Sequence, residues 1–539
     1  MAEADTARLC TQIIHSHFGP LTSTIVSTLL SRGRLSLPQL IRYTSIKPRT
    51  VRASILVLVQ HNILWHATSD DDGEVFEVNI DECLTRLRFG RFVWQAGHQF
   101  GAAAEEIVQL VLDHGKIRSP DIVSSLLTRN AKDTTVYAQV LYKLVSESYL
   151  KPSTILSHVS PRDKRIRYES EEKAKISGFP TAKELREARE TAASRLKREE
   201  EEAERVGLKR KAKDHGGRPA KASEPEEVVD DTVYFRVNYD KFNTHIRNKL
   251  IESSARERFN DGAALVIRAA LKATESKQKT IEDIRSDSTT AANIAMEITD
   301  DDSLISGLVT SSSRKPKTIT VVKQYLGMLA FSDNPTPAGR AASFLSFGGS
   351  KVYVEFGIIG TRLRRRVLEA VTRERHGDDG VRVLRLLLDT GKVDEKQISK
   401  IAMIAPKDTR PLLAAMSAES LISIQEVPKS ADRNPTRTFY LWYVDLAKAS
   451  SVLLVNLYKT LYNTEMRKRA EKDESEIKAV LEKRERTDVS QDESLLTRNE
   501  RELLREWETR IEKLTILQGR VEEAVFILRD LGRLGIGED

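Results

Sequence analysis

Three basic residues that could bind a nucleic acid lie at the start of one amphipathic segment: Lys47, Arg49 and Arg52. The segment 49–61 is predicted to be a helix, because apolar residues recur on one side of it at Val51, Ile55, Leu58 and Val59. Cations at the start of a helix can bind phosphates and, in a groove, reach base edges. A solvated face, or a face that docks on protein, would carry the same residues. DNA contact and protein contact therefore both stay open here.

A second basic cluster is denser, with Arg362, Arg364, Arg365 and Arg366 close together. Consecutive positions on a helix cannot all point one way. We expect two of these arginines to pair with carboxylates or to lie along the surface, and Arg362 and Arg365 are the candidates for DNA contact. A third cluster is typical of a nuclear-import signal and consists of Lys209, Arg210, Lys211 and Lys213.

Catalytic patterns are missing from the sequence. Gly348–Gly349 lacks the Lys-Ser/Thr of a phosphate loop, no Gly-x-Ser-x-Gly occurs, and 70–72 is predicted to be a turn. The two cysteines and ten histidines show no metal-ligand spacing. We therefore expect a non-catalytic protein with no cofactor and no metal.

Composition limits the class of protein further. The chain has 539 residues, 40% hydrophobic and 31% charged, and 86 basic against 79 acidic residues give a net charge of +7. That length predicts several domains, and that charge permits nucleic-acid contact without demanding it. No apolar run approaches the roughly 18 residues of a membrane span. We expect a soluble intracellular protein with no membrane partner.

A short sequence motif, called here the repeated phrase, occurs three times and consists of a glycine, a basic residue and an aliphatic residue. Its copies begin at Gly33, Gly115 and Gly391. An apolar-periodic helix precedes each copy. A second amphipathic helix follows it, in which one large apolar residue stands five before another: Leu58 and Ile63, Leu144 and Tyr149, Met416 and Leu421. Helix, turn, short helix, longer helix and then strands is the order of a winged helix-turn-helix. In the first wing, Trp65 and Phe76 are expected to face each other.

The predicted fold class is mainly α with small β wings: four tandem winged-helix domains followed by a C-terminal antiparallel coiled-coil hairpin. The third unit is degenerate, with 279–284 in place of the repeated phrase. The second unit is interrupted by a charged, aromatic-poor insertion at about 160–231, which we expect to be disordered, with a helix at 182–205 held by i,i+4 charge pairs. The expected domains are 1–92, 93–240, 241–358, 359–444 and, for the hairpin, 445–539.

The hairpin is predicted from a seam of apolar residues that alternate by three and four. Two surface helices packed on the fourth unit are the alternative. The seam residues are Leu504, Trp507, Ile511, Leu514, Val521, Val525 and Leu528.

Four stretches of the sequence also resemble one known family: 14–19, 29–35, 51–62 and 237–242. Together with the order of the units, they resemble the third-largest subunit of RNA polymerase III, a relative of the large subunit of the general transcription factor IIE. The resemblance covers essentially the whole chain.

This resemblance implies a nuclear, non-catalytic subunit that helps bind and open promoter DNA, with its hairpin anchored on the clamp of the largest subunit. The implied partners are other polymerase III subunits, including a smaller winged-helix subunit and an acidic-tailed one, promoter DNA, and initiation factors of the same system. A free-standing winged-helix transcription or chromatin factor is the alternative, and a scaffold of the ubiquitin-ligase kind is a third class.

Overall fold

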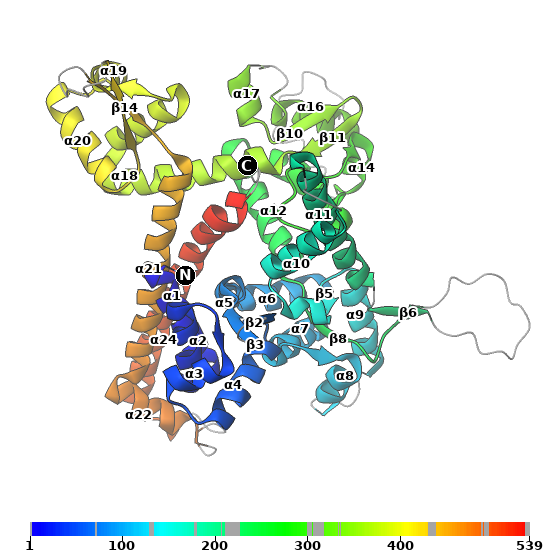
Figure 1. Cartoon of the computed structure of the whole chain (residues 1–539). Helices are drawn as coiled ribbons and strands as arrows, with labels where there is room; N and C mark the ends of the chain where they lie inside the picture. Colours follow the sequence, from blue (N-terminus) through cyan, green and yellow to red (C-terminus); the bar gives the residue numbers. More distant parts are fainter. Residues whose placement is uncertain are drawn as a thin grey trace, which may run out of the picture. The chain divides into compact units, whose positions relative to one another are not determined.

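The computed structural model describes residues 3–69, 73–128, 134–176, 181–205, 207–210, 227–298, 304, 317–331, 334, 336–429, 438–486, 489 and 495–533 (Figure 1). The chain divides into two compact units, Met1–Ile246 and Arg247–Asp539. Within the described residues the fold is mainly helical and holds four three-stranded antiparallel sheets and one two-stranded sheet. This arrangement is consistent with tandem winged-helix domains.

The first sheet has the strand order β1-β3-β2 and is covered by helices that bury Leu9, Ile14 and Ile25. Its elements, in chain order, are α1 (Ala4–Phe18), α2 (Pro20–Arg32), β1 (Leu35–Ser36), α3 (Leu37–Thr44), α4 (Pro48–Gln60), β2 (Leu64–Ser69) and β3 (Gly73–Val78).

The second sheet, β4-β8-β5, closes around an aromatic core that includes Phe92, Tyr149, Phe235 and Phe242. Its strands β5 and β8 are far apart in sequence. The elements are α5 (Ile80–Thr85), η1 (Arg86–Arg88), α6 (Phe89–Phe100), α7 (Ala102–His114), β4 (Ile117–Arg118), α8 (Ser119–Leu127), α9 (Thr134–Ser146), β5 (Leu150–Pro152) and β8 (Tyr234–Val237).

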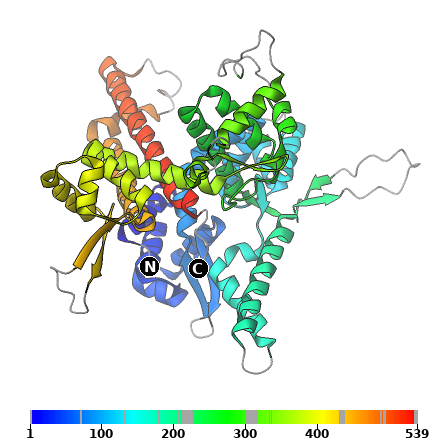
Figure 2. The same ribbon diagram turned by 90° about the horizontal axis from the view of Figure 1, so that it is seen from above.

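In its described residues the insertion between β5 and β8 is largely helical, and this corrects the prediction of disorder there. It forms η2 (Ile155–His158), α10 (Pro161–Ala174), α11 (Ala182–Arg205), β6 (Leu208–Arg210) and β7 (Glu227–Val229). Figure 2 shows α10 and α11 as the turquoise pair of helices. The helix expected at 182–205 is α11, and it carries the expected i,i+4 pairs, such as Arg186–Glu190 and Arg198–Glu202.

The two insertion helices hold each other with little apolar surface, which is why composition alone predicts disorder. Tyr168 of α10 is buried, its hydroxyl donates to Glu199 of α11, and Arg195 lies over its ring at 4.6 Å. The small side chains of Ala188 and Ala192 allow this close approach. One aromatic ring and two alanines therefore replace a conventional core.

The third sheet, β10-β11-β9, belongs to the second unit. Its elements are α12 (Tyr239–Arg258), which enters from the first unit, α13 (Asp261–Lys272), η3 (Glu275–Lys277), β9 (Thr289–Thr290), α14 (Ala291–Met296), α16 (Thr318–Leu329), α17 (Pro337–Ala342), β10 (Leu345–Gly348) and β11 (Lys351–Val354). The prediction for 279–284 is wrong, because that segment is a loop and β9 pairs with β11 instead. Without its glycine, the degenerate phrase could not be placed from sequence.

The fourth sheet, β12-β14-β13, follows a long helix that changes direction at Gly377, where φ is 69°. The elements are α18 (Phe356–Thr390), β12 (Val393–Asp394), α19 (Glu395–Ala402), α20 (Pro406–Ala418), β13 (Ser423–Pro428) and β14 (Thr438–Tyr443).

The chain then runs through α21 (Leu446–Asp473), α22 (Ser475–Arg484), α24 (Arg498–Val525), the π-helical η6 (Phe526–Asp530) and η7 (Leu531–Arg533). Helices α21 and α24 lie side by side and run in opposite directions. Gln518 Nε2 donates to Glu465 Oε1 at 2.6 Å, while further along α21 Glu471 pairs with Arg510 at 3.1 Å.

The repeated phrase has one structural meaning in its three copies. Each glycine ends a helix with a positive φ: 88° at Gly33, 75° at Gly115 and 84° at Gly391. Glycine adopts this conformation without the steric cost that a Cβ brings. The aliphatic residue then enters a short strand and stands opposite an aromatic residue of the wing: Leu35 with Phe76, Ile117 with Phe235, and Val393 with Trp442. Each phrase thus joins the helices to the last wing strand.

The apolar pairs five residues apart mark how each long helix ends. Ile63 N donates to Leu58 O at 2.9 Å, and the same bond joins the other pairs: Tyr149 to Leu144 at 2.9 Å and Leu421 to Met416 at 3.0 Å. This is the six-to-one bond of a Schellman helix end, which places the two apolar side chains against each other.

The expectation that Trp65 faces Phe76 is wrong. Phe76 stands opposite Leu35 and His66, and Trp65 stands opposite Glu77. Residues directly opposite each other in an antiparallel pair share a face, so the actual register separates the two aromatic side chains.

Candidate nucleic-acid interface

Helix α4 is positioned by the turn chemistry of the residues before it. Ser36 and Gln39 form a capping box at the start of α3, and Ser45 ends α3 with a left-handed φ of 56°. Lys47 then precedes Pro48, which sits in the first turn of α4, where its missing N–H costs nothing. The helix–turn–helix geometry thus follows from local sequence.

The basic face of α4, consisting of Lys47, Arg49 and Arg52, is open to solvent. All three side chains are exposed, and in the described part of the chain none is held by an ion pair or a side-chain hydrogen bond. The other side of α4 buries Val51 and Leu58 in the core of the sheet. The structure therefore brings the three predicted cations to one exposed helix start.

Two further exposed residues of α3 and α4 were not singled out from the sequence. Arg42, in the last turn of α3, is exposed. Leu56, one turn after Arg52 on α4, is 71% exposed. An exposed basic residue close before the turn could have been noticed from sequence. The exposed leucine could not, because it reads as part of the apolar stripe.

The far end of α4 is fixed to the region of the second sheet in the same unit. Gln60 Nε2 donates to the carbonyl oxygens of Lys116 at 2.6 Å and His114 at 3.2 Å, and Lys116 Nζ donates back to Val59 O at 2.9 Å. A Cβ on Gly115 would lie 2.7 Å from Gln60 O. The repeated glycine and the basic residue after it therefore also connect the regions of the first and second sheets.

Burial lowers the pKa values of three side chains at this junction, those of His61, His158 and Lys116. It lowers the pKa of His61 to about 3, helped by the positive charge of Arg86, and lowers the pKa of His158 to about 4, helped by Lys116. The pKa of Lys116 itself falls to about 8 because of burial and, next, the charge of Arg236. Both histidines are therefore neutral at physiological pH.

Arg362 and Arg365, the DNA-contact candidates on α18, are half-buried, and both are engaged by other residues of the second unit, unlike the cations of α4. Arg362 Nη1 donates to Ala342 O at 2.5 Å. Arg365 bridges Glu369 at 3.1 Å and Asp389 at 2.9 Å. Their neighbours are engaged too, Arg364 with Gly532 O at 3.3 Å and Arg366 with Glu257. Two of the four arginines, Arg365 and Arg366, thus pair with carboxylates, as the sequence led us to expect. Which two they are depends partly on residues distant in sequence, so the local pattern could not reveal it.

The seven hairpin candidates on α24 and η6 are buried or half-buried: Leu504, Trp507, Ile511, Leu514, Val521, Val525 and Leu528. Leu504 and Trp507 pack with Ile477 and Leu481 of α22. Leu528 joins Leu368 in the core of the fourth winged helix. Polar contacts also join these helices and could not be predicted from the apolar seam: Gln518 contacts both Glu465 and Lys468.

The import candidates are only partly described. Lys209 and Arg210 lie in β6, where Lys209 Nζ contacts Asp230 Oδ1 at 2.7 Å. Lys211 and Lys213 lie outside the described residues.

Two general features bear on the chemistry of the chain. Among the described residues, no group of three or more His, Cys, Asp or Glu side chains could hold a metal ion. In the same residues, no helix is long and apolar enough to cross a membrane.

Three family models match the chain, and all describe one subunit. They are the RNA polymerase III subunit RPC82 helix-turn-helix domain at residues 8–67, the RNA polymerase III subunit RPC82 family at 139–335, and the POLR3C C-terminal winged-helix domain at 368–444.

Curated relatives match over nearly their whole length. The DNA-directed RNA polymerase III subunit RPC3 of Danio rerio is 26% identical over 553 residues, covering 97% of this chain and 98% of the relative. That of Homo sapiens is 26% identical with 97% of each chain covered, and that of Coccidioides immitis is 26% identical with 97% and 99% covered. The chain therefore belongs to the RPC82/RPC3 family, the family of a non-catalytic subunit of RNA polymerase III.

Proposed function

We propose that this chain helps RNA polymerase III bind and open promoter DNA in the nucleus, and that it works as part of the polymerase and not alone. The observation that carries the proposal is the pairing of full-length family membership with a free basic helix start at Lys47, Arg49 and Arg52. A general polymerase opens many promoters, so the contacts should go mainly to phosphates, which position DNA without reading its sequence.

The proposal assigns the chain's parts as follows. Residues 1–92, 93–240, 241–358 and 359–444 are four winged helices, and 445–539 is an antiparallel coiled-coil hairpin that anchors the chain on the clamp of the largest subunit. The opposite directions of α21 and α24 and the burial of Leu504 and Val525 support this reading of the hairpin. A smaller winged-helix subunit, an acidic-tailed subunit and initiation factors complete the proposed partners.

The first test is assembly. The tagged full-length chain, purified from nuclear extract, should bring down a full set of RNA polymerase III subunits. Recovery of the chain without polymerase would favour a free-standing winged-helix factor.

The second test is DNA binding by a triple variant, Lys47→Ala with Arg49→Ala and Arg52→Ala. Binding dominated by phosphate contacts falls steeply with salt, and losing up to three contacts should flatten the logarithmic slope by about 0.9 per contact. The loss should be equal on unrelated sequences. Promoter opening should slow, while elongation on a pre-melted template should be unchanged.

The matched control removes three exposed cations that already have carboxylate partners on α11, Lys183, Arg186 and Arg198. It changes the net charge equally and should leave the slope nearly unchanged. Loss of affinity at one sequence only would show base reading and favour the free-standing factor. Loss of assembly with normal DNA binding would show that the exposed Leu56 side of α4 docks on protein.

A further inference from the structure

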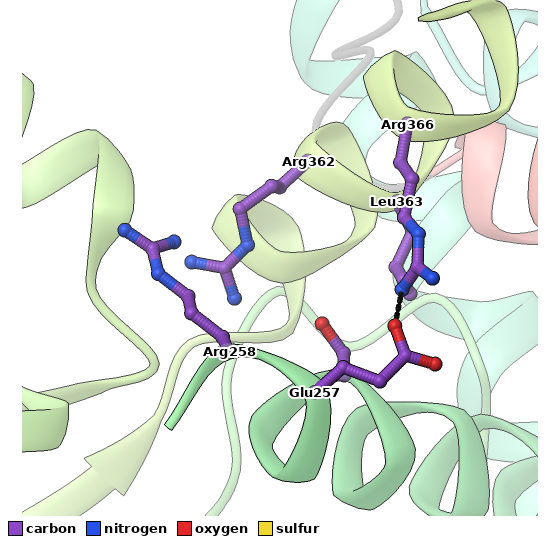
Figure 3. Close-up of a pocket in the computed structure, with 6 residues that line it drawn as sticks. Glu257, Arg258, Arg362, Leu363 and Arg366 are labelled. Carbon is purple, nitrogen blue, oxygen red and sulfur yellow. Dashed lines mark ion pairs between the residues drawn. The ribbon is translucent and has the colours of Figure 1, made fainter. Parts of the chain in front are cut away.

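A small cavity in the second unit is bordered by three arginines from two helices. It has a volume of about 190 Å³ and is lined by Ser254, Glu257 and Arg258 of α12 and by Arg362, Leu363 and Arg366 of α18. Figure 3 shows that Arg366 reaches toward Glu257, whereas the guanidinium groups of Arg258 and Arg362 lie side by side on the other side of the cavity. The three arginines are therefore not equivalent.

The guanidinium groups of Arg258 and Arg362 converge on one carbonyl oxygen. Arg362 Nη1 donates to Ala342 O at 2.5 Å, and Arg258 Nη1 donates to the same oxygen at 3.4 Å. An aromatic ring supports each group: Arg362 lies 3.8 Å over Phe344, and Arg258 lies 4.9 Å over Phe331. Stacking fixes the plane of a guanidinium group and leaves its edge free for hydrogen bonds. The pair is thus held in place before any ligand arrives.

The charges of this pair are not neutralised within the described residues. Glu257, the carboxylate that lines the cavity, is paired with Arg366. Burial and the charge of Arg258 lower the pKa of Arg362 to about 10, which still leaves it a cation at neutral pH. Arg362 Nη2 is buried without a hydrogen-bond partner. Two adjacent cations that share only a neutral carbonyl repel each other, and an anion at the cavity would relieve that repulsion.

We propose that Arg258 and Arg362 bind one phosphate group of a nucleic-acid backbone. Arg258 is exposed and is the direct donor, while Arg362 is the fixed charge behind it. A carboxylate can be satisfied by a single guanidinium fork, whereas a tetrahedral phosphate presents oxygens to two guanidinium groups in different planes. The shared geometry therefore favours phosphate. This inference rests on the proposed function, because the backbone would be that of the DNA the polymerase engages.

The deciding variant is Arg258→Gln in the full-length chain, since Arg258 is exposed and its loss should leave the thermal midpoint unchanged. We expect weaker binding to duplex DNA of unrelated sequences, and a salt slope flatter by about 0.9, the value for one phosphate contact. Arg366→Gln is the control, because it removes a charge from the same cavity that Glu257 already neutralises. A second variant, Arg362→Gln, should also flatten the slope.

Two further measurements separate the outcomes. Titration with inorganic phosphate should show binding in the wild type that Arg258→Gln weakens, without any macromolecule present. If Arg258→Gln instead weakens binding of a polyglutamate peptide and leaves the DNA slope unchanged, the cavity takes acidic protein, and the proposal is overturned.

Failure of this inference differs from failure of the proposed function. Wild-type DNA binding that falls in the α4 triple variant but not in Arg258→Gln overturns only the phosphate site. A wild-type chain that binds inorganic phosphate but no duplex DNA, alone or in the polymerase, overturns both.

Discussion

The basic face of α4 and the arginine run of α18 look equally suited to DNA in the sequence and differ completely in the structure. On α4, Lys47, Arg49 and Arg52 are exposed and hold no partner among the described residues. On α18, Arg362 stacks on Phe344 and Arg365 bridges two carboxylates. The density of positive charge therefore does not indicate which surface is available.

The difference has a physical cause in spacing and surroundings. Arg49 and Arg52 stand three apart on one helix face, opposite the buried Val51 and Leu58. The arginines of α18 point in several directions: Arg362, Arg364 and Arg366 each meet another element of the unit, whereas Arg365 meets two carboxylates of α18 itself. A run of adjacent cations thus serves to join elements, whereas a spaced pair at a helix start remains free.

The largest predicted effect comes from separating the C-terminal segment from the arginine run. Leu528 is 5% exposed and packs beside Leu368 of α18, and a few residues later Gly532 O accepts from Arg364. Leu528→Asp should bury an unpaired charge and destabilise the second unit by about 3–5 kcal/mol. Thermal unfolding measures the loss, and hydrogen exchange over 356–368 should show α18 released.

The control for this change lies on the neighbouring helix. Leu517 of α24 is 44% exposed, so Leu517→Asp adds the same charge at a solvated position and should shift the midpoint little. Equal midpoints for the two variants would show that Leu528 does not connect α18 to the C-terminal helices.

The next effect tests the comparison directly with two arginine-to-alanine changes. Arg362→Ala removes the stacking on Phe344 and the bond to Ala342 O, and should cost about 1–3 kcal/mol in the free energy of unfolding. Arg49→Ala should cost within about 0.5 kcal/mol, the usual range for a free surface residue. Thermal unfolding of both variants is the measurement. A larger loss for Arg49→Ala would reverse the assignment of free and internal cations.

The sequence predicts the repeating architecture well because its signals are local. A positive φ is found at Gly33, Gly115 and Gly391. A helix end is marked by Leu58 and Ile63, because the Ile63 N–H donates to the carbonyl oxygen of Leu58, five residues earlier. Such features depend on neighbours in the chain, so a pattern can reveal them. The family matches agree with the resemblance found in the sequence.

The rest depends on partners far away in sequence. Arg362 contacts Ala342 and Phe344, and Tyr168 contacts Glu199 and Arg195. The residues around Arg362 and Tyr168 in the sequence therefore do not predict what either side chain contacts. The same reason explains why the insertion was expected to be disordered. The exposure of the three cations of α4 could be predicted from the sequence, because a helix with one apolar face fixes the direction of the other.

Helix α4 combines a free start with a fixed end. The cations at its start have no partner among the described residues, whereas its end, beside His61, is bonded to Lys116. A change of pH should affect the fixed end and not the free start. The pKa of His61 is about 3 in the folded protein against an ordinary 6.5. Because the folded pKa is lower, the unfolded state takes up the proton first. Stability present above pH 6.5 is therefore lost as the pH falls toward 3, by up to about 1.4 kcal/mol per pH unit for this group.

Hydrogen exchange over 55–66 at pH 7 and pH 5 measures this effect. Protection should fall at pH 5 in the wild type, and His61→Gln should make that fall smaller, with His158, whose pKa is also lowered, accounting for part of the remainder. His98→Gln is the control, because His98 is exposed. An unchanged pH response in His61→Gln would assign the effect to another group, such as His158.

The smallest effect concerns Arg34, a cation that is fixed although it belongs to the same winged helix as the free ones. Arg34 Nε donates to Glu77 at 2.7 Å, and its Nη2 lies 2.9 Å from Asp163 of the insertion. Asp163→Asn keeps the side-chain shape and the bond from Asp163 N to Ser160, but removes the charge. Both partners are mostly buried, so we expect a loss of about 1 kcal/mol in the free energy of unfolding, at the upper end for a partly solvated pair.

Faster hydrogen exchange or proteolysis in 161–174 measures this loss. The control is Glu169→Gln, which breaks only a local i,i+4 pair with Lys173. If both variants behave like the wild type, contacts other than those of Arg34 hold the insertion against the first sheet and its helices. The comparison of free and fixed cations in this region would then depend on Lys116 alone.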